Sequence, residues 1–171
     1  MANQVYFKLK VKGAKDNVVE FVEILKGNRT QHFVCTSVDK VEDMVTLGEK
    51  VTQIVTGYCD QSVGYGLNDM GNLMSKYPSI TNLTTESTIL NLDIEVYSKE
   101  PAMCFEEHFC VSNGNILVDE VVESIDYHWR KEDFTTIEMF NEAYGTSFKE
   151  DDFSEDGFLT VGGYPEWEFS F

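Results

Sequence analysis

Residues 89–118 read ILNLDIEVYSKEPAMCFEEHFCVSNGNILV, and this stretch carries the clearest strand and turn signals in the chain. Aliphatic side chains occupy alternate positions at its start, at Leu90, Leu92, Ile94 and Val96. A period of two is typical of a β-strand with one apolar face and one polar face. The pattern predicts a central strand from Ile89, whose apolar face the rest of the chain must cover.

A β-hairpin is predicted directly after that strand. Residues 98–101, SKEP, break the alternation, and Phe105 and Phe109 then lie on one face of a second strand. Asn113-Gly114 favours a two-residue hairpin turn, because both residues tolerate a positive φ. We expect both phenylalanines to be buried and a third strand to begin after Gly114.

The chain before residue 89 contains further periodic segments. The predicted elements are a strand at 5–11, a helix at 18–25, strands at 31–38 and 51–59, and a helix at 67–77. Asp16 or Asn17 is expected to cap the first helix. Residues 39–47 fit a short helix, and a longer helix over residues 41–55 competes with the strand predicted at 51–59.

The chain after the hairpin is less decided. Residues 117–129 fit both a strand and an amphipathic helix, and we favour a short strand that gives way to helix or irregular structure. A last helix is expected to begin at Thr135 or Thr136 and to end at Gly145. Residues 157–171 predict one or two short strands, and alternating aromatic residues at their end predict a docked segment.

These elements follow the βαββαβ order of a ferredoxin-like fold. The predicted class is α+β: a ferredoxin-like antiparallel sheet with two helices on one face, an added β-hairpin and a C-terminal helix-plus-strand extension. A length of 171 residues suits one domain with an appendage. We expect the ferredoxin-like domain and its hairpin over residues 1–130, and an acidic extension over residues 131–171 that packs on the same domain.

Negative charge is concentrated in the second half of the chain. Thirteen basic and 30 acidic residues give a net charge of −17. Residues 1–85 contain nine of each kind, whereas residues 86–171 contain four basic and 21 acidic residues. Such a field repels nucleic-acid phosphates and attracts basic surfaces. Acidic residues also raise solubility, whatever the function.

The composition favours a cytoplasmic protein. The chain has no run of about 18 apolar residues, so we expect no membrane span. Its start, MANQVYFKLK, lacks the apolar segment of a secretion signal. The four cysteines show no CxxC spacing, and reduced thiols are the expectation in that compartment.

Parts of the chain resemble the YubB-type family of ferredoxin-like proteins encoded by plasmids and phages. The similarity is sharpest over residues 75–114, where SKYPSI (75–80) precedes IEVYSKEPAMCFEEHF (94–109) and the Asn-Gly turn. Members of the family similarly run a helix into a Y/F-P pair, then a strand ending in Y-x-E-P, then a phenylalanine-led hairpin. The resemblance implies a ferredoxin-like fold and a mobile-element origin. It implies no activity and no catalytic residues.

One strand carries a candidate metal or thiol site. Cys104, Glu106, His108 and Cys110 occupy alternate positions, so they would share a face opposite Phe109. Cysteine and histidine are zinc ligands, but neighbours two apart on a straight strand lie about 7 Å apart. We therefore expect no bound metal or other cofactor. A metal- or thiol-dependent enzyme built on Cys104, His108 and Cys110 is kept as an alternative.

Motifs of known catalytic or phosphate-binding chemistry are absent from the sequence. It contains no G-x-S-x-G, H-E-x-x-H, P-loop or G-x-G-x-x-G pattern. We therefore lean towards a protein without catalytic activity. Residues 149–156, KEDDFSED, also lack the order of ligands that an EF-hand calcium loop requires.

The leading hypothesis is a non-enzymatic, mobile-element-type protein that binds a basic surface of a host protein. Acidic residues around aromatic ones can imitate nucleic acid, so a nuclease or another nucleic-acid-binding enzyme suits the charge best. Direct binding to nucleic acid is not expected. The candidate partner-binding residues are Asp119, Glu120, Glu123, Asp126, Glu150, Asp151, Asp152, Glu155 and Asp156. A structural or regulatory homodimer, joined through a sheet edge, is a third hypothesis.

Overall fold

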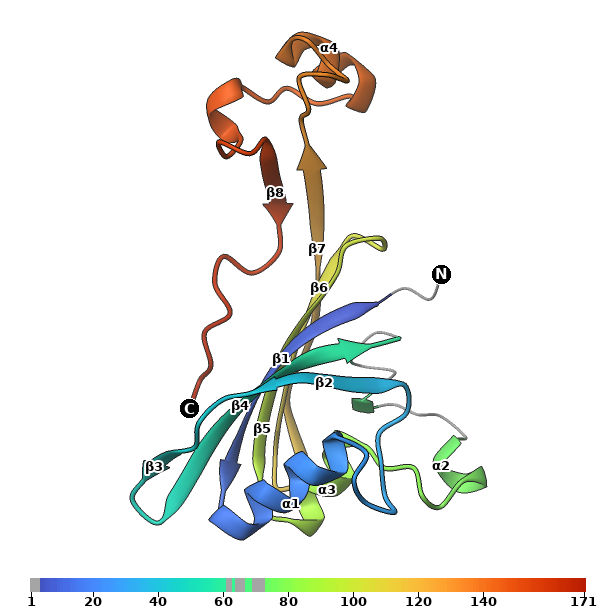
Figure 1. Cartoon of the computed structure of the whole chain (residues 1–171), viewed down its shortest axis with the longest axis vertical. Coiled ribbons are helices and arrows are strands. Elements are labelled where there is room, and N and C mark those ends of the chain that lie inside the picture. The colour runs from blue at the N-terminus through green and yellow to red at the C-terminus, as the bar shows by residue number, and fades with distance from the viewer. Residues whose placement is uncertain (1–3, 61–62, 64–66, 69–72) are drawn as a thin grey trace.

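The computed structural model describes residues 4–60, 63, 67–68 and 73–171. These residues form an antiparallel sheet of eight strands, together with four α-helices. The strands are β1 (Val5–Gly13), β2 (Thr36–Val41), β3 (Val45–Leu47), β4 (Lys50–Cys59), β5 (Asp93–Glu100), β6 (Phe105–Ser112), β7 (Asn115–His128) and β8 (Phe158–Gly162). The helices are α1 (Lys15–Leu25), α2 (Leu73–Lys76), α3 (Leu83–Ile89) and α4 (Ile137–Tyr144). Figure 1 shows α1 and α3 near one end of the molecule and α4 at the other.

Strand β1 lies in the middle of the body of the sheet. The strand order is β2-β4-β1-β5-β6-β7-β8, and β3 pairs with β4 beside this path. Val5, Phe7, Leu9 and Val11 of β1 are all buried, while the residues between them are half-buried. The sequence prediction of a strand at residues 5–11 is therefore confirmed. We call the side with these apolar residues the inner face and the opposite side the outer face.

Helices cover the inner face (Figure 1). Val18, Phe21, Val22 and Leu25 of α1 recur at helical spacing and belong to the core that includes the apolar side chains of β1. The predicted helix is confirmed, but its predicted cap is wrong. Ala14 is the N-cap residue and makes no side-chain cap.

The central strand begins later than predicted. Residues 83–89 form α3, because Asn82 caps this helix by accepting a hydrogen bond from the Thr85 amide at 2.7 Å. Ile89 therefore ends a helix, and its side chain is 62% exposed. The predicted alternation holds from Leu92 onwards, where Leu92 and Ile94 are fully buried.

The hairpin after β5 is confirmed. Ser112 pairs with Asn115, so Asn113 and Gly114 form a two-residue turn, and both have a positive φ. Phe109 is 1% exposed, as predicted. Phe105 is only half-buried, so the prediction that it is buried is wrong.

Several boundaries and assignments in the ambiguous segments were wrong. Residues 39–47 are not a helix, because they contain the end of β2 and the whole of β3. The strand predicted at 31–38 starts later, at Thr36. The helix over 41–55 is likewise wrong, since β4 occupies this region. Residues 117–128 all belong to β7, so the helical alternative there is wrong and the predicted strand was too short. The helix predicted at 67–77 is observed as α2, and residues 69–72 lie outside the described part.

The last third of the chain has a small core of its own. Trp129, Ile137, Phe140 and Phe153 are buried together, separately from the core under the sheet. Thr136 caps α4 by accepting from the Met139 amide at 3.4 Å, and the helix stops at Gly145, as predicted. Figure 1 shows β7 and β8 linking this unit to the sheet. The predicted domain boundary at residue 130 stays a prediction.

No helix in the described residues is long and apolar enough to cross a membrane.

Candidate partner-binding surface

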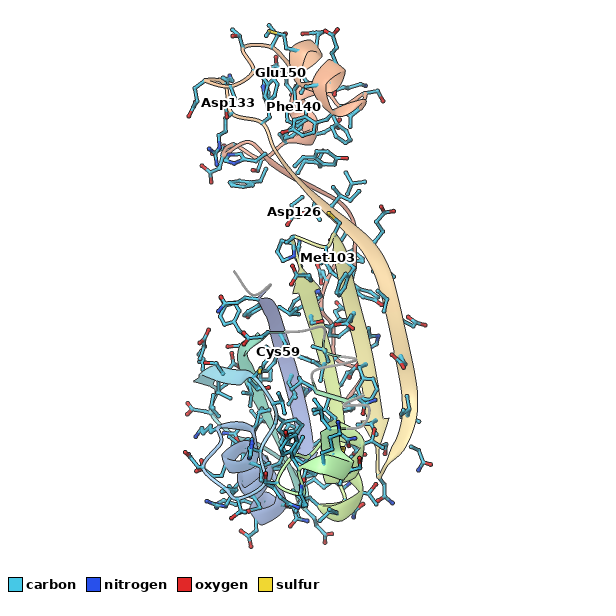
Figure 2. All side chains as sticks on the ribbon, turned by 90° about the vertical axis from the view of Figure 1, so that its right-hand side faces the viewer. Cys59, Met103, Asp126, Asp133, Phe140 and Glu150 are labelled. Carbon is cyan, nitrogen blue, oxygen red and sulfur yellow. The ribbon has the colours of Figure 1, made fainter. Side chains whose placement is uncertain are left out.

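The acidic residues of the second half gather on a projecting part of the molecule. We define the acidic arm as residues 119–156, which run from the middle of β7 through α4. The arm contains thirteen acidic and three basic residues, a net charge of −10, and all sixteen charged side chains are exposed. Figure 2 shows Asp126 partway along the arm, with Asp133 and Glu150 near its end. The nine predicted partner-binding residues all lie on this arm and are all exposed.

Four of these nine residues lie on β7. This strand carries Asp119, Glu120, Glu123 and Asp126, and an extended strand exposes side chains alternately on two sides. Residues up to Glu123 pair with β6, whereas β8 pairs only with residues 124–128. Among the described strands, none pairs with the other edge of β7 before residue 124. This part of the acidic arm is therefore an exposed sheet edge.

Asp126 is the one arm carboxylate with a described ion pair. Its Oδ1 lies 2.7 Å from Lys99 Nζ and accepts a hydrogen bond from Thr160 Oγ1 at 2.6 Å. Desolvation would raise the pKa of Asp126, but the hydrogen bonds from Lys99 and Thr160 outweigh it and lower the pKa. Asp126 is thus partly compensated within the chain, unlike the other arm carboxylates.

An aromatic cluster fixes the end of the arm. The rings of Trp129 and Phe153 lie 5.8 Å apart edge to face, and those of Phe140 and Phe153 lie 5.4 Å apart in the same way. Trp129 Nε1 donates to the carbonyl oxygen of Phe134 at 2.9 Å, which satisfies the buried indole. The cluster holds the loop at residues 149–156 in place, so its carboxylates lie on a fixed support.

A cavity of about 730 Å³ opens beside this cluster. Four of the predicted binding residues line it, namely Glu150, Asp151, Glu155 and Asp156. Basic side chains border it as well, and Lys131 Nζ lies 5.5 Å from the centre of the Trp129 ring. The cavity therefore combines carboxylates with an aromatic wall that already attracts one ammonium group.

Asp152 has a structural role that its predicted role did not include. Its Oδ2 accepts a hydrogen bond from the Lys149 main-chain amide at 2.7 Å, which closes the short 3-10 helix at residues 150–152. The carboxylate remains exposed, but it does not line the cavity. Of the five predicted acids in this loop, four are therefore at the cavity and one stabilises the loop.

The candidate metal and thiol residues are only partly brought together. Cys104 precedes β6 with a positive φ of 57°, and its thiol faces the Pro101 carbonyl oxygen at 3.7 Å. His108 stacks on Tyr97 with ring centres 4.1 Å apart. Burial, with help from Glu95, raises the pKa of the Cys110 thiol to about 11, so the reactive thiolate is scarce at neutral pH. Within the described part of the chain, no three His, Cys, Asp or Glu residues are arranged to hold a metal.

A second group of carboxylates was missed by sequence reasoning. Glu95 and Glu106 stand at polar positions of their strands, yet their residues are 0% and 4% exposed. Both accept hydrogen bonds from the last residues of the chain, including the Ser170 amide at 2.7 Å and Trp167 Nε1 at 3.1 Å. Only the alternating aromatic residues near the end of the sequence pointed to a docked segment, and they did not identify what it docks against.

Comparisons of the chain with protein-family models, with curated proteins and with solved structures found no match.

Proposed function

We propose that the protein is a non-enzymatic binding protein whose acidic arm engages a basic surface of a partner protein. The observation that carries the proposal is the exposure of every charged residue on the arm, where thirteen acids outnumber three bases. The arm is held by its own aromatic core, so its charges are presented on an ordered support rather than on a random coil. An ordered array loses less conformational freedom on binding than a flexible tail.

The partner class is a nucleic-acid-binding protein, such as a nuclease. Surfaces that bind nucleic acid are lined with lysine and arginine, and a fixed row of carboxylates can occupy them as phosphates do. The cavity at the end of the arm adds a place for one partner arginine or lysine beside Trp129. A cytoplasmic setting and a phage or plasmid origin, as in YubB-type proteins, belong to the same proposal.

The sheet body supports a ferredoxin-like assignment within this proposal. Its strand order β2-β4-β1-β5 is the order in which a βαββαβ chain forms an antiparallel sheet. Helices α1 and α3 connect these strands and pack on β-strands of this sheet. We infer that residues 5–100 are the ferredoxin-like unit, and that β6, β7 and the arm are additions to it.

The test is capture and competition with matched charge variants. The immobilised full chain would capture partners from a host lysate at about 50 mM salt, and the purified partner would then be assayed for nucleic-acid binding. We expect the chain to displace nucleic acid from that partner. The arm variant removes four charges at the cavity: Glu150→Gln, Asp151→Asn, Glu155→Gln and Asp156→Asn.

The control variant removes the same number of exposed charges from the sheet body: Asp16→Asn, Asp39→Asn, Asp43→Asn and Glu49→Gln. We expect the arm variant to lose at least tenfold in competition and the control variant to match the parent. Equal loss in the two variants would show that only net charge matters. Direct binding of DNA or RNA by the parent chain would refute the proposal.

A second candidate function is self-association through the free edge of β7. Ile116, Leu117 and Val121 on this strand are 49%, 63% and 62% exposed, which is unusual beside an unpaired strand edge. A second copy could pair with this edge and cover these side chains. Sedimentation of the parent and of Leu117→Lys at increasing concentration tests it, and a monomeric parent at 100 µM (roughly the upper range for a functional dimer) removes it.

A further inference from the structure

The last nine residues lie across the outer face of the sheet. We call residues 163–171 the strap. Figure 1 shows it leaving β8 and running back past the sheet without regular secondary structure. The Trp167 ring is stacked on Tyr6, with centres 5.8 Å apart, and on Tyr97, with centres 5.9 Å apart. The indole therefore lies over two tyrosines from neighbouring strands, β1 and β5.

Two further aromatic rings of the strap lie over a row of lysines. Phe169 is 5.5 Å from Lys8 Nζ and 5.7 Å from Lys10 Nζ. Phe171 is 5.8 Å from Lys10 Nζ and 5.4 Å from Lys12 Nζ. The alternating aromatic residues of the strap thus match the alternating residues of β1, and each phenylalanine ring attracts two ammonium groups.

Buried carboxylates hold the main chain of the strap. Glu95 Oε2 accepts from the amide and the hydroxyl of Ser170 at 2.7 and 2.9 Å. Glu106 Oε2 accepts from the Tyr164 amide at 3.0 Å. The Tyr97 hydroxyl donates to the Glu168 carbonyl oxygen at 2.9 Å. These contacts read an extended backbone rather than particular side chains, which is how a peptide-binding surface works.

The outer face differs from a permanent core in two respects. No residue of the strap is fully buried, whereas the residues of β1 that face the helices are buried. In addition, Lys8, Lys10 and Lys12 form no ion pair with any acidic side chain of the described residues, and Glu166 and Glu168 are exposed. The face therefore has positive charge that its present occupant leaves unpaired.

The junction between β8 and the strap allows separation. Gly162 and Gly163 have φ values of 82° and 73°, a conformation that other residues rarely adopt. A chain that changes direction at two glycines can detach its end without disturbing the strand before it. The strap can therefore leave the outer face while β8 stays paired with β7.

We propose that the outer face is a binding site for an extended peptide of a partner protein, with aromatic residues at alternate positions and acidic residues between them. The strap occupies this site as an internal competitor. The stacked Tyr6 and Tyr97 select the first aromatic residue, the lysine row takes the next two and the intervening acids, and Glu95 and Glu106 fix the backbone. This proposal does not depend on the function proposed for the acidic arm.

The test uses a labelled synthetic peptide with the sequence of residues 163–171 and the full chain. A strap variant, Trp167→Ala with Phe169→Ala and Phe171→Ala, weakens the internal competitor. We expect it to bind the peptide at least about tenfold more tightly than the parent, because a tethered competitor acts at millimolar effective concentration. A scrambled peptide and the added substitution Lys10→Gln should each weaken binding at least about fivefold. Tyr77→Ala, which removes an exposed aromatic elsewhere, should bind as the parent does.

Several results would overturn the proposal. One is a folded strap variant that does not bind the peptide, or that binds the scrambled peptide equally well. Another is a parent dimer that Trp167→Ala abolishes, because the occupant would then be a second copy. If the strap variant does not fold, amide hydrogen exchange of the parent decides. We expect the Ser170 amide to exchange at least about 100-fold faster than the Val96 amide through local opening. Equal rates would make the strap a permanent part of the fold.

Discussion

Phe109 lies in the middle of the inner face, where it is 1% exposed and pairs across the sheet with Val96 of β5. Truncating a buried phenylalanine removes its contacts and leaves a cavity, so Phe109→Ala should destabilise the protein by about 3–5 kcal/mol. Chemical unfolding measures this. Met103→Ala is the control, because Met103 is 61% exposed and its loss should change stability by less than about 0.5 kcal/mol. A Phe109→Ala variant that unfolds with the parent would contradict the packing described for β6.

Gly114 is a residue that its neighbours and its backbone both require. Its φ is +78°, and a Cβ there would come within 2.0 Å of Thr88 Oγ1. Gly48 also has a positive φ, of +65°, but a Cβ there would meet nothing within 4 Å. Gly114→Ala should therefore destabilise the protein more than Gly48→Ala does, and Gly114→Val should be worse still. Melting temperatures test the order, and Thr88→Gly should recover part of the loss in Gly114→Ala.

Asp126 should make stability depend weakly on pH. Its pKa is lowered in the folded state, so its charge stabilises the fold above its ordinary pKa of 3.8. That contribution is lost as the pH falls through the lower, folded-state value. Asp126→Asn should lower stability by less than about 1 kcal/mol near neutral pH, because the pair with Lys99 is near the surface. Unfolding curves at pH 7 and pH 3 measure the difference between the two proteins.

The difference should shrink at the lower pH. Glu132→Gln is the control for loss of an arm charge, since Glu132 has no ion pair among the described residues. A difference that grows on acidification would show that the contact with Lys99 does not form in solution.

At the scale of elements, the hairpin could be predicted because its signals are local. The Asn-Gly dipeptide and the alternation on both sides of it fix the turn and register without help from distant residues. The segment at 117–129 could not be decided in the same way, because its valines fit both periods. It forms a strand because β6 and β8 supply pairing partners along the whole of β7, and only the folded chain shows β8 to be one of them.

Two other elements show where local patterns mislead. Helix α3 was missed because Leu90 continues the alternation of Leu92 and Ile94 by chance, and that pattern outweighed the cap at Asn82. The burial of Glu95 could not be predicted either. A glutamate at a polar strand position reads as exposed, and its burial depends on a segment 75 residues further along the chain.

Helix α4 permits a direct test of the second core. Thr136 caps the helix, whereas its exposed neighbour Thr135 does not. Thr136→Ala should destabilise the protein by about 1 kcal/mol, within a usual range of about 0.5–2 kcal/mol for the loss of such a cap. Thr135→Ala should change stability by less than about 0.5 kcal/mol. Tryptophan fluorescence during unfolding follows the change, because Trp129 lies in this core. Equal effects of the two substitutions would show that the cap does not stabilise α4.

At the scale of the whole molecule, the charges of the second half divide into two groups. Five acidic residues of β5, β6 and α3 are buried, while all thirteen acids of the arm are exposed. The sequence identified the excess charge and the residues of the arm, because composition is independent of fold. It could not separate buried from exposed carboxylates, nor place four of the arm acids around one cavity, since both depend on contacts between distant segments.

The division changes how a charge variant should be designed. Replacing both Asp151 and Asp152 would remove a binding charge together with the hydrogen bond to the Lys149 amide. A loss of partner binding in that double variant would therefore mix two effects. Substitutions at the cavity that leave Asp152 intact measure the binding surface alone.

The dependence of partner affinity on salt tests the central claim about the acidic arm most directly. Between about 50 and 500 mM salt the Debye length falls from about 14 Å to about 4 Å, so a charge-driven complex should weaken by at least about 100-fold. The four-charge arm variant should bind more weakly at low salt and depend less steeply on salt, while the control variant on the sheet body should keep the slope of the parent. An affinity that does not change with salt, or an arm variant with the slope of the parent, would contradict the account.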